Sequence, residues 1–548
     1  MACKAGVLPA GTVAYTYDRR DPAPYRPRRQ SGHQGDLRRP AVPRKRGRRP
    51  GTGRVSPQQS EHAAEGTSPH RRRLVLACCS TSIVIVILDF TALNVALPMI
   101  QRDLHTSVSG LQWILAAYGL VLCSLQMSAG AIGDRTGHRR TFRIGLCIFV
   151  LGSTLCAVAP TLEWLVFFRV LQGIGAAVLS PLSLSIIAGV FSGEAERARA
   201  IGTWSSASGI ALAAGPLLGG AVVDSLGWRY VFWVSVLVAL IALLLTRHVP
   251  ESRTATVRGA DPVGQVLMTV FLAALVYVII EGPGQGWDTP LILACICVVV
   301  AALTALVPYE LHRRHPLIDP RFFRSVPFTS AALIAMVAVG AGAGFLFLST
   351  LYLQDARHLS ALQTGLWLLP MTAMTVILAP LAGRLTAALG PRIPLLIAGA
   401  ALTAGGLMYT LADAETGSVP ALMAAFALNG IAYGIALTPV TQMVVSGLPP
   451  AQSGVAGGVI MTSRLVGQAL GIAVTGAFLS TTLHSTTHRS PTAFAEASLP
   501  AWWIITACGA TIALLGTLAT TPWAQATAQR TGLLFTDPAP PPNCRPNP

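Results

Sequence analysis

The chain has 548 residues, of which 52% are hydrophobic and only 11% are charged. A soluble domain carries roughly 25% charged residues, so this composition excludes a water-soluble protein and indicates that lipid is the main solvent. The net charge of +17 is concentrated in residues 1–73, which hold 17 Lys and Arg against 5 Asp and Glu.

This basic segment is rich in Arg, Pro and Gly, which is typical of a solvated disordered tail. A nucleic-acid or anionic-lipid arm is the less favoured alternative, and a reading frame begun too far upstream would give the same pattern. We therefore assign the tail no function and expect no nucleic-acid partner.

Fourteen apolar runs follow the tail, each about as long as the twenty residues that cross a bilayer. We therefore expect an all-α polytopic membrane protein, with a turn at residues 281–283 between the seventh and eighth runs. The runs are 74–96, 110–132, 141–160, 163–189, 199–223, 229–247, 262–281, 290–308, 328–353, 362–383, 392–412, 420–446, 454–481 and 500–521.

Arginines predict the orientation of these runs. Loops after the even-numbered runs carry fifteen arginines and the opposite loops carry four, so the positive-inside rule places both termini in the cytoplasm. Arg outnumbers Lys 38 to 2, which is typical of a GC-rich genome. We therefore expect a multi-pass protein of a bacterial cytoplasmic membrane.

A faint internal repeat predicts two halves. Residues 130–139 (GAIGDRTGHR), after the second run, share two glycines and the last arginine with residues 383–392 (GRLTAALGPR), after the tenth. Repeated halves are usual in secondary transporters, which bind substrate where the halves meet. The predicted domains are a tail at 1–73, six-helix bundles at 74–247 and 328–521, two inserted helices at 262–308 and a cytoplasmic tail at 522–548.

Few charged residues lie deep inside the apolar runs, and each is costly enough to need a reason. Asp89 lies about fifteen residues into the first run, and Arg169 lies about seven residues into the fourth, which runs the opposite way. Their similar depth permits a direct or water-bridged pair. A carboxylate there is a natural proton carrier, because protonation removes its charge. The alternative is that Asp89 only stabilises a kinked helix, with Arg169 as a fixed counter-ion.

Two further features of the runs are open to interpretation. Arg464, with Gln468 one turn later, either faces an internal polar cavity or extends its side chain to the lipid headgroups. The fifth run carries the sequence GIALAAGPLLGG at 209–220, whose small residues favour close helix packing and whose proline bends the helix.

The sequence contains no arrangement typical of an enzyme. The stretch at 173–178 mimics a dinucleotide-binding loop but lies inside a continuous apolar run, and there is no Walker lysine motif. Most of the ten cysteines lie in apolar runs without metal-ligand spacing. We therefore expect neither metal nor cofactor, and the proton gradient as the energy source.

Together these segments resemble the major facilitator superfamily, and within it the fourteen-helix drug:proton antiporter branch (EmrB/QacA-like). The resemblance covers roughly residues 74–521. The segments that carry it, in chain order, are LDFTALNVALP (88–98), GAIGDRTGHRR (130–140), RVLQGIG (169–175), GIALAAGPLLGG (209–220), WRY (228–230) and YLQ (352–354).

The resemblance implies that Asp89 binds the proton and that Arg169 tunes its release. It implies a cytoplasmic gate in which Asp134 latches the end of the second run to the other half. The implied gate residues are Gly130, Asp134, Arg135, Gly137 and Arg139. The implied antiporter helix uses Gly209, Gly215, Pro216, Gly219 and Gly220. Candidate polar residues of the cavity are Asn94, Gln172, Gln354, Arg464 and Gln468.

The chain also departs from the branch. His138 replaces an arginine of the gate motif, Ser235 begins a stretch that lacks an Asn-x-Pro, and the tenth and thirteenth runs contain no acid. The expected substrate is therefore a neutral, zwitterionic or monocationic amphiphile. We expect a monomeric proton-coupled exporter of an antibiotic, drug or secondary metabolite. The alternatives are a transporter of a specific metabolite or siderophore, and a non-transporting membrane sensor.

Overall fold

The computed structural model describes residues 68–252, 261–313, 319–411, 419–445, 453–483 and 491–535. The expected N-terminal tail up to residue 67 and the C-terminal residues from 536 onward lie outside these ranges. Within the described part, fourteen helices are long and apolar enough to cross a membrane. The predicted all-α membrane fold is therefore confirmed.

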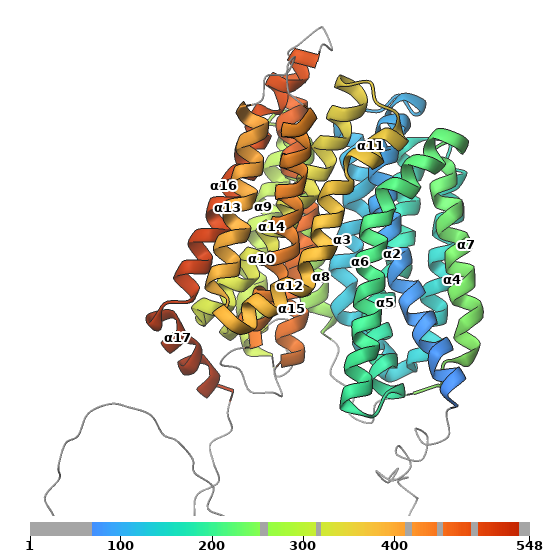
Figure 1. Ribbon diagram of the computed structural model, residues 1–548, viewed down its shortest axis with the longest axis vertical. Helices are drawn as coiled ribbons and strands as arrows, with labels where there is room; N and C mark the ends of the chain where they lie inside the picture. Colours follow the sequence, from blue (N-terminus) through green and yellow to red (C-terminus); the bar gives the residue numbers. More distant parts are fainter. Residues whose placement is uncertain are drawn as a thin grey trace, which may run out of the picture. The chain divides into compact units, whose positions relative to one another are not determined.

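The first six long helices form one group (Figure 1). The contacts within it are extensive between α2 and α6, between α4 and α5, and between α3 and α5. Ser68 and Ser107 begin α2 and α3 by accepting hydrogen bonds from backbone N–H groups of the first turn. The helices are α2 (Pro69–Asp103), α3 (Val108–Thr136), α4 (His138–Ala157), α5 (Leu162–Val190), α6 (Glu194–Leu226) and α7 (Arg229–Leu245).

A second group follows from residue 326. The tenth expected run is divided into two helices, since the first ends at Trp367 and Pro370 occupies the first turn of the next. The last helix lies in the segment predicted as a tail and packs against α10. The elements are α10 (Val326–Leu351) with its π-helical turn η3 (Tyr352–Ala356), α11 (Ala361–Trp367), α12 (Leu369–Leu389), α13 (Arg392–Leu411), α14 (Val419–Val445), α15 (Ser453–Leu483), α16 (Pro491–Ala519) and α17 (Pro522–Leu533).

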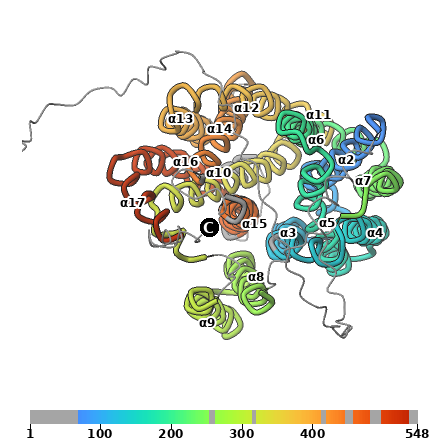
Figure 2. Tube along the Cα trace, turned by 90° about the horizontal axis from the view of Figure 1, so that it is seen from below, coloured from blue at the N-terminus to red at the C-terminus, as the bar shows by residue number. Residues whose placement is uncertain are grey.

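Two helices, α8 (Pro262–Gln285) and α9 (Pro290–His312), lie between the groups in sequence. The expected turn at residues 281–283 is displaced, because α8 continues through Pro283 and ends before Gly286, whose φ of +94° suits glycine. Figure 2 shows α8 beside both α3 and α15, and α9 on its outer side. The apolar surface of α9 is mostly exposed, as expected for a helix that faces lipid.

The contacts of α8 differ between its two neighbours. On the α3 side, Trp113 Nε1 donates to Glu281 Oε1 at 2.7 Å, and Ser128 donates to Gln265. On the α15 side, Ala469 and Ala473 join an apolar cluster with α8. The helix is therefore tied to α3 by hydrogen bonds and meets α15 through small apolar side chains.

Polar contacts between the two groups gather at one end of the molecule, at the top of Figure 1 beside α11. Asp224, near the end of α6, accepts hydrogen bonds from the backbone N–H groups of Ala361 and Leu362, at 3.0 and 2.9 Å. Arg102 pairs with Asp355 at 3.0 Å. These contacts join helix ends that are far apart in sequence. The domain limits drawn from the sequence repeat remain predictions.

Candidate functional site

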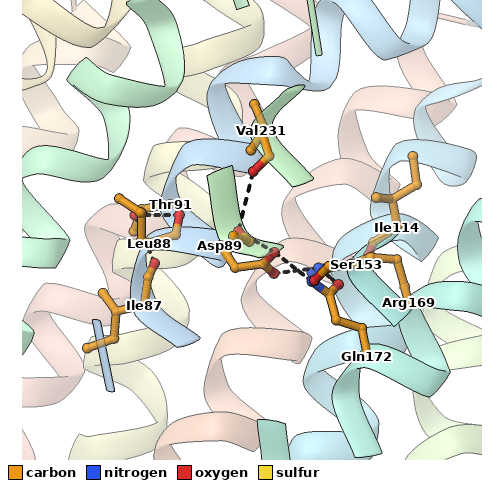
Figure 3. A network of polar contacts seen from close by, with 10 residues as sticks. Ile87, Leu88, Asp89, Thr91, Ile114, Ser153, Arg169, Gln172 and Val231 are labelled. Atoms are coloured by element: carbon orange, nitrogen blue, oxygen red, sulfur yellow. Dashed lines mark hydrogen bonds and ion pairs between the residues drawn. The ribbon is translucent and has the colours of Figure 1, made fainter. Parts of the chain in front are cut away.

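A buried ion pair joins α2 and α5. Asp89 and Arg169 are both fully buried, and Arg169 Nη1 lies 2.5 Å from Asp89 Oδ2 (Figure 3). Gln172, one turn after Arg169, donates from Nε2 to Asp89 Oδ1 at 2.8 Å. The carboxylate therefore has a charged partner on one oxygen and an amide on the other, the arrangement that a buried charge requires.

Serines from two other helices extend this network. Ser235 of α7 lies 3.4 Å from Asp89 Oδ1, and Ser153 of α4 accepts from Gln172 Nε2 at 2.6 Å. The carboxylate of α2 is therefore contacted by side chains from α5 and α7, and α4 joins the network through Gln172. The sequence analysis did not assign Ser153 to the site, because serines are common in membrane helices and usually bond to their own backbone.

Arg169 has partners besides Asp89. Its Nη1 donates to Gln172 Oε1 at 2.5 Å, and its Nε donates to the backbone oxygen of Ile114 at 3.1 Å. The guanidinium carbon lies 4.1 Å from the centre of the Tyr118 ring. These contacts would continue to stabilise the guanidinium charge if Asp89 were neutral. The sequence analysis missed Tyr118, for which the available signal was an aromatic polar residue in the second apolar run.

The arrangement has a definite chemical capability. In its ion-paired form the site has no net charge, which limits the cost of burial in a membrane. A proton on Asp89 would leave Arg169 positive but still bonded to Gln172, Ile114 and Tyr118. Protonation of Asp89 would therefore remove the ion pair without removing every contact of Arg169.

The predicted antiporter helix, α6, lies directly against α2 beside Asp89. A side chain at Gly215 would overlap Thr91, and one at Gly219 would place its Cβ 2.7 Å from the Ala92 Cα. The absence of a side chain at these positions is therefore what lets α6 approach the segment of α2 that follows Asp89.

The same helix also meets the second group. A side chain at Gly220 would overlap the backbone of Ala361, and Gly365 of α11 packs on the backbone of Pro216. Gly209 is different, since its closest neighbour, the side chain of Val376, would lie 3.7 Å from an added Cβ. Four of the five predicted positions therefore form tight contacts, and the fifth has room.

The predicted gate residues surround the turn between α3 and α4. Gly137 separates the two helices with a φ of +105°, which explains why glycine occupies this position. Asp134 Oδ1 lies 3.2 Å from His138 Nε2. Gly130 has open space around it.

This turn also contacts the end of the sixth long helix. The His138 backbone N–H and its Nδ1 both lie within 3.0 Å of the backbone oxygen of Ser252. Arg139 donates to the backbone oxygen of Arg247 at 3.3 Å, just past α7. Ser252 was not predicted, and no sequence pattern marked it. These contacts tie the gate segment to its own half.

The remaining predicted residues do not join the Asp89 network. Asn94 is fully buried, and its amide atoms have no hydrogen-bond partner in the described part of the chain. Gln354 instead ties the groups together, since it donates to the backbone oxygen of Val95 at 2.8 Å. Arg464 Nη1 lies 3.6 Å from Met461 Sδ, and the described residues give it no ion-pair partner. Gln468 is half-buried on the same helix.

Two groups of apolar helices, two further helices between them in sequence and an ion pair buried inside the first group are typical of a secondary transporter, a protein that moves a solute without catalysing its conversion. Comparisons with known proteins give the family. The profile of the Major Facilitator Superfamily matches residues 79–472. The chain belongs to this superfamily, and it is a multi-pass membrane transport protein rather than an enzyme.

Relatives with assigned names support a narrower placement. The chain is 34% identical over 414 residues to the multidrug resistance protein Stp of Mycobacterium tuberculosis, covering 75% of this chain and 77% of the relative. It is 34% identical over 433 residues to the tetracenomycin C resistance and export protein of Streptomyces glaucescens, covering 78% of each. A methylenomycin A resistance protein of Streptomyces coelicolor is 34% identical over 436 residues, covering 78% of this chain and 89% of the relative. The resemblance to the drug:proton antiporter branch is confirmed.

Solved structures agree on the fold. A bacterial homologue of the human lysosomal transporter Spinster, in an inward-facing conformation, superimposes with a TM-score of 0.59 at 19% identity. That comparison covers 85% of this chain and 99% of the other. The xylose transporter XylE of E. coli gives a TM-score of 0.56 at 14% identity, covering 82% and 98%.

Proposed function

We propose that the protein exports a small hydrophobic or amphipathic compound, such as an antibiotic, drug or secondary metabolite, in exchange for protons. Three relatives that share about a third of its residues over most of their length are named for drug resistance or export. The observation that carries proton coupling is the buried pair of Asp89 and Arg169, since intramembrane ionisable residues mark ion pathways.

The proposed cycle uses the two states of this pair. A proton arriving at Asp89 neutralises the carboxylate and weakens its attraction to Arg169, which keeps its contacts with Gln172 and Tyr118. Because Gly215 and Gly219 seat α6 against α2 just past Asp89, a shift in α2 reaches the interface with α11. Proton binding is thereby coupled to the fit between the halves, and the compound leaves in the opposite direction.

We place the protein in a bacterial cytoplasmic membrane with both termini in the cytoplasm, as the arginine distribution supports. In that orientation, the contacts of Asp224 with α11 and of Arg102 with Asp355 close the outer side. The substrate is proposed to carry at most one positive charge, because the α12 and α15 spans contribute no carboxylate to balance a second.

The test compares Asp89→Asn with the wild type in proteoliposomes that carry an imposed proton gradient. The amide keeps the shape of the side chain and cannot carry a proton at physiological pH. We expect export of a fluorescent amphiphile driven by the gradient to fall at least about a hundredfold, which corresponds to roughly 2.7 kcal/mol in the transition free energy. Proton release on addition of the compound should disappear with it.

Asp103→Asn is the matched control, because Asp103 lies on the same helix but pairs with Arg229 at a partly exposed end. This variant should transport like the wild type. If Asp89→Asn exports the compound at the wild-type rate, Asp89 is not the proton carrier. Failure of the wild type to export any compound of a broad panel would remove drug export itself.

A further inference from the structure

A cavity of about 380 Å³ lies between the starts of α2 and α6, on the surface of the first group. Arg72 and Arg73 line it from α2, and Arg199 lines it from α6. Leu76 and Phe191 give it an apolar wall. The cavity is far along α2 from Asp89 and is not part of the proton site.

The charges at this cavity are unbalanced. Arg72 pairs with Glu196 at 3.2 Å, so these two largely neutralise each other. Arg73 and Arg199 are exposed, and neither has a carboxylate within ion-pair distance in the described part of the chain. Two of the three guanidinium groups that line the cavity are therefore not balanced by a carboxylate, and both are placed to bind an anion.

The position of the cavity along the helices fixes its depth relative to a membrane. On α2 the arginines come directly before the apolar run, in which Val75 and Cys78 are already fully buried. On α6 the charged residues occupy the first turns, and Ala200 is the first buried residue after them. The cavity therefore lies where polar ends give way to apolar surface, at the level of the lipid headgroups.

We propose that this cavity binds an anionic phospholipid of the inner leaflet. Its phosphate would lie between Arg73 and Arg199, and the first part of an acyl chain would follow Leu76 and Phe191. Guanidinium groups match phosphate oxygens in geometry and charge, and basic pockets at the cytoplasmic ends of membrane helices suit anionic headgroups. A cationic amphiphile would be repelled there. The proposal goes beyond drug export and does not depend on it.

Native mass spectrometry of the purified full-length protein tests the proposal. Palmitoyl-oleoyl phosphatidylglycerol and phosphatidylcholine with the same chains are titrated separately, and the bound fraction is measured. The double variant Arg73→Gln/Arg199→Gln should bind phosphatidylglycerol about tenfold more weakly and phosphatidylcholine unchanged. The control Arg143→Gln/Arg197→Gln removes the same charge from cytoplasmic helix ends outside the cavity, and should bind both lipids like the wild type.

Thr203→Trp provides a second route, since it fills the cavity from its exposed wall and keeps every charge. It should weaken phosphatidylglycerol binding as well, even if the double variant does not fold. Glycerol phosphate, which has the headgroup without the chains, should not compete. Competition by glycerol phosphate would overturn the lipid assignment in favour of a soluble phosphate. The cavity would not be the binding site if the control variant lost as much phosphatidylglycerol binding as the double variant. The same conclusion would follow if Thr203→Trp bound phosphatidylglycerol like the wild type.

Discussion

The two six-helix groups bury different kinds of side chain at their centres. In the first, Asp89, Arg169, Gln172 and two serines form a polar network that links four helices. In the second, aromatic rings form a buried cluster, in which Tyr409 stacks on Trp502 at 4.0 Å between ring centres. Phe345, Tyr352 and Phe426 pack around this pair.

The two groups therefore differ in the chemistry of their interiors. The first half contains a buried carboxylate paired with an arginine, whereas the second is held together by tightly packed apolar and aromatic side chains. Each half also contains one intramembrane arginine, but only Arg169 has a carboxylate partner in the described structure. Substitutions at matched positions in the two halves should therefore behave differently.

Removing Arg169 should produce the largest effect. Arg169→Met leaves Asp89 buried with its charge uncompensated, which costs about 3–5 kcal/mol and should abolish the yield of monodisperse protein. Adding Asp89→Asn removes the stranded charge and should restore the folded protein without restoring transport. Size-exclusion profiles and thermal midpoints in detergent measure both outcomes. A stable single variant would show that the pair does not hold these helices together.

Packing of α6 on α2 should give the next largest effect. Gly219→Ala places a Cβ against the backbone of Ala92, so α2 must shift, at a cost of about 1–3 kcal/mol. Gly209→Ala, ten residues earlier, would meet the Val376 side chain only at van der Waals distance and should be neutral or stabilise the helix by up to about 1 kcal/mol. The thermal midpoint of Gly219→Ala should fall, whereas that of Gly209→Ala should stay the same or rise. Equal destabilisation would mean that the close contact with α2 is not what requires glycine.

The contact of Tyr118 with Arg169 should contribute a smaller amount. Tyr118→Leu removes a cation–π interaction of about 1–2 kcal/mol and should slow gradient-driven export while the protein stays folded. Tyr118→Phe keeps the ring and removes a hydroxyl that has no hydrogen-bond partner in the described part of the chain, so it should export normally. If the phenylalanine variant fails as the leucine variant does, the hydroxyl rather than the ring is required.

Arg464 should give the smallest change in stability. Arg464→Gln breaks no ion pair seen in the described residues, so the free energy of unfolding should fall by about 1 kcal/mol or less. Its thermal midpoint should remain near that of the wild type, in contrast to Arg169→Met. A collapse of the folded yield would show that the second half depends on a buried charge as the first does.

Much of the fold could be predicted from the sequence, because the length and hydropathy of a segment largely decide whether it spans a membrane. The spans followed from apolar runs, and the similar depths of Asp89 and Arg169 made their contact foreseeable. The positions at which helices are interrupted were harder to predict, since Pro283 lies inside α8 whereas Pro370 lies in the first turn of a new helix. A proline near a helix end is tolerated or disruptive according to tertiary packing, which a single sequence does not reveal.

The surroundings of the ion pair were the least predictable part. Ser153 and Tyr118 lie on other helices than Asp89, and their side-chain directions depend on how α4 and α3 rotate about their axes. Neighbouring turns of an apolar helix look alike in hydropathy, so no periodic signal fixes that rotation. The pair of Asp89 and Arg169 could be predicted from the sequence. The residues that contact the pair could not, because their positions depend on how the helices pack.

The position of α8 has a mechanical consequence. A helix that touches both groups cannot move rigidly with both, so any rotation of one group against the other must break or slide one of its interfaces. The α3 interface carries the hydrogen bonds of Trp113 and Gln265, whereas the α15 interface is lined by Ala469 and Ala473. Van der Waals contacts between small apolar side chains can shift more readily than hydrogen bonds, which depend on direction. In the proposed transport cycle we therefore expect the inserted helix to move with the first group and to slide along α15.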